Sequence, residues 1–188
     1  MSREEIVSTL KLFNEKADKL RNSNFVRNAV ADSGVNLSWR AGQPAEVRRR
    51  GPDQENIDAF VLTLRFFLQD NEITSFRNLS ANIYASTLVP EEYRLQFEKP
   101  RAALNDFLDG NTMFNFGGII SRRELLEVFL FGDLSHANKE KKKKFEEWMA
   151  SSLVSPFFEN EFVMILFELL NIILFVQKLN QRVIAELT

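Results

Sequence analysis

Residues 162–176 read FVMILFELLNIILFV, an apolar run that only Glu168 and Asn171 interrupt. A membrane-spanning helix needs about 20 apolar residues, and a charged side chain near its centre costs roughly 2.5–3.5 kcal/mol. On a helix, the polar residues in and around this run share one sector about 100° wide: Glu161, Glu168, Asn171, Lys178 and Arg182. The pattern therefore predicts a long, mostly buried C-terminal helix with one polar edge, opened by Ser155-Pro156, and favours this over a membrane span.

The N-terminal third of the chain carries the same helical periodicity. Between residues 2 and 20, apolar residues recur at alternating intervals of four and three, which places them on one helix face. The pair Gly51-Pro52 marks a break between elements, and the acidic residues that follow it are typical of the first turn of a helix. A second helix is expected after Pro52.

Shorter helices are expected in the middle of the chain. One covers residues 75–87, and another opens at Pro90 and bends or restarts at Pro100, because proline lacks an amide hydrogen. Ser121 and Glu124 form a capping box ahead of a further apolar stretch. The predicted fold class is therefore all-α, a multi-helix bundle.

The one exception to helical periodicity is a predicted β-hairpin at about residues 35–50. Val35, Leu37 and Trp39 alternate with polar residues, and a similar alternation follows the turn sequence AGQP at residues 41–44. A two-stranded hairpin is marginal alone, so we expect it to rest on the helices.

The composition is that of one globular domain covering residues 1–188. Hydrophobic residues make up 45% and charged residues 27% of the chain, which suits a single core. The absence of cysteine excludes disulfides and thiolate metal sites. Because Met1 leads into charged amphipathic sequence and not into an apolar signal segment, we expect a cytoplasmic protein.

The aromatic residues are dominated by phenylalanine. Eighteen Phe stand against two Tyr and two Trp, and the phenyl ring offers apolar surface without a polar group. These rings are therefore expected to fill a core or an oligomer seam. With the apolar final helix, they predict a two-fold homodimer.

Sequence motifs for enzymatic chemistry are absent. The chain has no phosphate-binding glycine loop, no dinucleotide fingerprint and no paired-histidine zinc motif. With one histidine and no cysteine, a transition-metal site would need carboxylates for nearly every ligand. We therefore expect neither a cofactor nor a metal.

The candidate catalytic residue is His136, the only histidine, in the sequence FGDLSHAN at residues 131–138. A histidine beside an acid and an amide could act as a general acid or base, because its ordinary pKa lies near neutrality. The alternative is that it satisfies backbone groups at a helix end. The position at a helix junction favours this structural role.

A candidate nucleic-acid-binding site lies on the predicted hairpin. Arg40 precedes the turn, Arg48, Arg49 and Arg50 follow it, and Trp39 is adjacent. Guanidinium groups beside an aromatic ring can hold phosphates and stack on a base. Charged residues on a hairpin also prevent edge-to-edge pairing, which is the interpretation we favour. The lysine-rich run at residues 139–144 would add phosphate contacts or form a solvated helix face.

The stretch from Phe129 to Phe145, followed by a long apolar helix, resembles the second half of HEPN-type helical domains. Members of that superfamily occur in bacterial and archaeal toxin, phage-defence and RNA-processing systems, and active members are dimeric, metal-independent ribonucleases. Active members carry an arginine shortly before the histidine, with four to six residues between them. Here the nearest preceding arginine is Arg123, which is too far from His136 to fit this spacing. The resemblance therefore implies a non-catalytic or divergent form.

Three functional hypotheses follow. The first is a non-enzymatic helical interaction or regulatory module that self-associates or binds a protein partner. The second is a divergent ribonuclease that uses His136 with arginines of the hairpin or with Arg122 and Arg123. The third is a regulator that binds nucleic acid through Arg48, Arg49, Arg50 and the lysine run without catalysis. The missing arginine motif favours the first.

Overall fold

The computed structural model describes residues 1–23, 54–108, 139–140, 143, 147 and 155–188. The main elements in these ranges are α1 (Arg3–Arg21), α4 (Gln54–Leu68), α5 (Phe76–Asn78), the π-helix η1 (Leu79–Ile83), α6 (Glu91–Leu108) and α9 (Ser155–Leu187). No strand occurs in this part of the chain, so the predicted all-α class is confirmed there. The predicted hairpin at residues 35–50 and the predicted helix after Ser121 lie outside the described residues.

Helix α1 contains the apolar repeat that the sequence predicts as one helix face, and a capping box opens it. The Ser2 hydroxyl accepts a hydrogen bond from the Glu5 backbone N–H (3.1 Å), and the Glu5 carboxylate accepts one from the Ser2 N–H (2.8 Å). This capping box satisfies two amides that have no partner within the helix. Asn22 caps the other end. The predicted apolar face is buried along its whole length: Ile6, Leu10, Phe13, Ala17 and Leu20.

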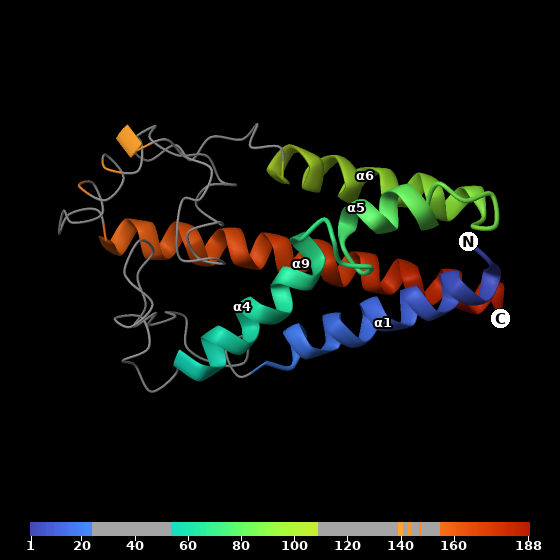
Figure 1. The fold of residues 1–188 in the computed structure, drawn as a ribbon, viewed down its shortest axis with the longest axis horizontal. Helices are drawn as coiled ribbons and strands as arrows, with labels where there is room; N and C mark the ends of the chain where they lie inside the picture. The colour runs from blue at the N-terminus through green and yellow to red at the C-terminus, as the bar shows by residue number, and fades with distance from the viewer. Residues whose placement is uncertain (24–53, 109–138, 141–142, 144–146, 148–154) are drawn as a thin grey trace.

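Helix α9 is the central element of the bundle. It lies between α1 and α6 and runs antiparallel to both, with the two chain termini at the same end of the molecule (Figure 1). The predicted polar edge is confirmed, since Glu168, Asn171, Lys178 and Arg182 are all exposed. Apolar residues of α9 on the opposite side, such as Ile173, Val176 and Val183, are fully buried. Side chains before Phe167 lie outside the description.

A cluster of phenylalanine rings joins α1, α4 and α5. The ring of Phe13 meets that of Phe67 edge-on, with centroids 4.7 Å apart, and that of Phe76 at 5.7 Å. The Ser75 hydroxyl accepts a hydrogen bond from the Asn78 N–H (3.2 Å) and so caps α5, which carries Phe76. These three rings fill the core, as expected for phenylalanine.

Helix α6 continues through Pro100 as one helix, so of the two predicted alternatives, a bend or a restart, the restart is wrong. A proline inside a helix removes one backbone hydrogen bond and crowds the preceding turn. Here Pro100 is buried and lies beside α9. Burial of its apolar ring offsets part of the local cost.

None of the described helices combines the length and the apolar composition that a membrane span requires. The long α9 contains the apolar run at residues 162–176. Its exposed charged residues interrupt the apolar surface, as the angular spacing predicts.

Candidate functional site

The site residues predicted from the sequence all lie outside the described residues: Trp39, Arg40, Arg48, Arg49, Arg50 and His136. Of the lysine run, Lys139 and Lys143 are described, and both are helical and exposed. The candidate site is therefore built from other residues. Two features stand out in the described part of the chain, a buried polar network and an apolar groove.

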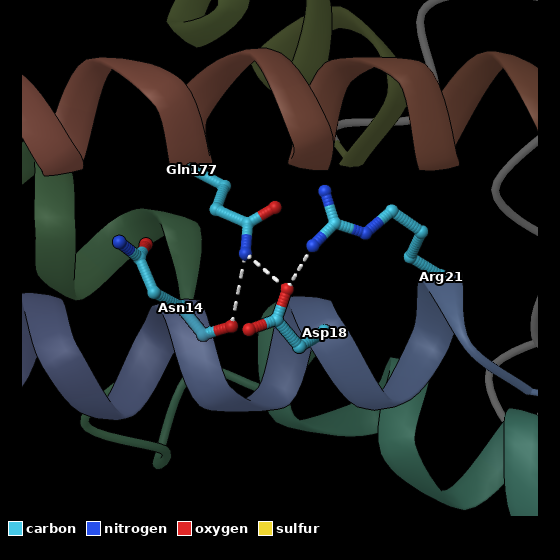
Figure 2. A network of polar contacts seen from close by, with 4 residues as sticks. All are labelled: Asn14, Asp18, Arg21 and Gln177. Atoms are coloured by element: carbon cyan, nitrogen blue, oxygen red, sulfur yellow. Dashed lines mark hydrogen bonds and ion pairs between the residues drawn. The ribbon is translucent and has the colours of Figure 1, made fainter.

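The buried polar network crosses the interface between α1 and α9. Gln177 on α9, only 2% exposed, donates through its side-chain amide to the Asn14 backbone carbonyl (3.1 Å) and to the Asp18 carboxylate (2.7 Å). Asp18 also pairs with Arg21, at the more exposed edge of the network (Figure 2). The amide thus joins two helices that are far apart in sequence.

Asn180 extends the network to a third element. Its side-chain oxygen accepts a hydrogen bond from the Tyr84 hydroxyl (2.5 Å), and its amide donates to the Asn14 side-chain oxygen (3.2 Å). Tyr84 follows the π-helix η1, and its ring stacks on Phe97 of α6 with centroids 4.0 Å apart. Because Asn180 is fully buried, these partners replace water.

The arrangement around Asn180 fixes how α1 and α9 align. Buried residues of α9 recur at intervals of four and three, and Asn180 occupies one of these core positions: Leu169, Ile173, Val176, Asn180, Val183 and Leu187. Apolar contacts tolerate sliding, whereas a buried amide that loses its partners costs about 1–3 kcal/mol. A buried Asn at such a position specifies register in paired helices. The network is therefore a positioning device.

Tyr84 does not provide acid–base chemistry near neutrality. Burial raises the pKa of its hydroxyl well above the ordinary value of 10.0, because the ionised form would lose its hydration. The group stays protonated and donates its hydrogen bond throughout the neutral range.

This shift predicts a pH dependence of stability. The folded chain holds the Tyr84 proton at pH values where the unfolded chain releases it, so its contribution is complete below about pH 10 and falls as the pH rises further. Urea unfolding at increasing alkaline pH should show this loss. Tyr84→Phe, which cannot ionise there, should have a shallower decline. Equal slopes for the two proteins would contradict the assignment.

The polar network is not evident from the sequence, because Gln177 and Asn180 follow the apolar run and resemble the first residues of a polar helix end. The signal was nevertheless present. Asn180 interrupts the four-three spacing that continues to Val183 and Leu187. A polar residue at a core position of a regular seam indicates a buried hydrogen-bonded partner.

The second feature is a hollow between α6 and α9, which we call the α6–α9 groove. It has a volume of about 370 Å³ and is lined by these residues: Lys99, Pro100, Ala103, Glu168, Asn171, Ile172 and Phe175. Phe175, one of these lining residues, is 46% exposed. An exposed ring beside an apolar hollow is typical of a binding surface.

The described residues contain no group of three or more histidines, cysteines or acidic residues placed to hold a metal ion. Comparisons with protein-family models, with curated proteins and with solved structures find no match for this chain.

Proposed function

We propose that this chain is a non-enzymatic helical interaction module that associates with a second copy of itself. The observation that carries the proposal is the α6–α9 groove with Phe175 exposed at its edge. Removing apolar surface from water contributes about 25 cal/mol per Å², so such a surface favours association. The buried side-chain amides of Gln177 and Asn180 already have hydrogen-bond partners within the chain.

The ribonuclease and nucleic-acid-binding hypotheses depend on residues outside the described ranges. Each hypothesis predicts a measurable property that distinguishes it from an interaction module. A ribonuclease turns over RNA, and a phosphate-binding protein loses affinity steeply as salt rises. An interaction module does neither.

The expected result is a concentration-dependent dimer without ribonuclease activity. Light scattering of the purified full chain should approach twice the 21.8 kDa mass of one chain as the concentration rises through the micromolar range. The same sample, incubated with RNA and a chelator, should show no turnover beyond buffer alone.

His136→Ala serves as the control for a catalytic role. We expect it to lower the free energy of unfolding by about 0.5–2 kcal/mol, as for the loss of a helix cap, and to leave the dimer intact. A monomer at every concentration would contradict self-association. RNA turnover that His136→Ala abolishes would contradict the non-enzymatic assignment.

A further inference from the structure

We draw no further inference here: the strongest candidate, the apolar α6–α9 groove with Phe175 exposed in its lining, already carries the proposed function, and nothing in the structure shows what covers it.

Discussion

Phe13→Ala is expected to lower the free energy of unfolding by about 3–5 kcal/mol, the usual cost of truncating a buried phenylalanine. The Phe13 side chain is fully buried and contacts the rings of Phe67 and Phe76. The variant loses the transfer energy of the ring and leaves a cavity, and two edge-on aromatic contacts disappear with it. Domains of this kind have a total stability of about 5–15 kcal/mol, so the loss is a large fraction.

Urea unfolding followed by circular dichroism measures this loss as a lower midpoint. Leu12→Ala is the control, because Leu12 is the preceding residue on α1 and is 36% exposed. It should cost far less than Phe13→Ala. Similar midpoints for the two variants would show that the ring cluster does not hold α1, α4 and α5 together.

Asn180→Ala is expected to destabilise the chain by about 2–4 kcal/mol. The substitution removes the acceptor of the Tyr84 hydroxyl and the donor to Asn14, and an unsatisfied buried polar group costs about 1–3 kcal/mol. The cavity left by the amide adds to this cost. Gln181→Ala, at the exposed neighbouring position on α9, should change stability by no more than about 0.5 kcal/mol.

A double-mutant cycle tests whether Tyr84 and Asn180 act as a pair. Tyr84→Phe keeps the ring on Phe97 and removes only the hydroxyl that donates to Asn180. Residues joined by a hydrogen bond typically show coupling of about 0.5–3 kcal/mol, so the double variant should lose less than the sum of the two single losses. Strict additivity would mean that the hydrogen bond between them contributes nothing to stability.

The candidate site was predictable from the sequence only in part. The angular spacing around Glu168 and Asn171 correctly predicted an exposed edge of the last helix, because helix geometry converts spacing into direction. It did not predict that Phe175, in the same sector, would lie beside a hollow of α6. That depends on which helix packs alongside, and periodicity within one segment carries no information about its neighbour.

The sequence by itself determined the helical class of the described residues and the buried face of α1. These are local properties, set by capping side chains and by the 3.6-residue repeat within a few turns. Only the tertiary structure decided that Pro100 continues a helix, that Asn180 meets Tyr84 and Asn14, and that α6 and α9 enclose a groove. Each of these depends on contacts between residues distant in the chain, where packing and hydrogen bonding outweigh local preference.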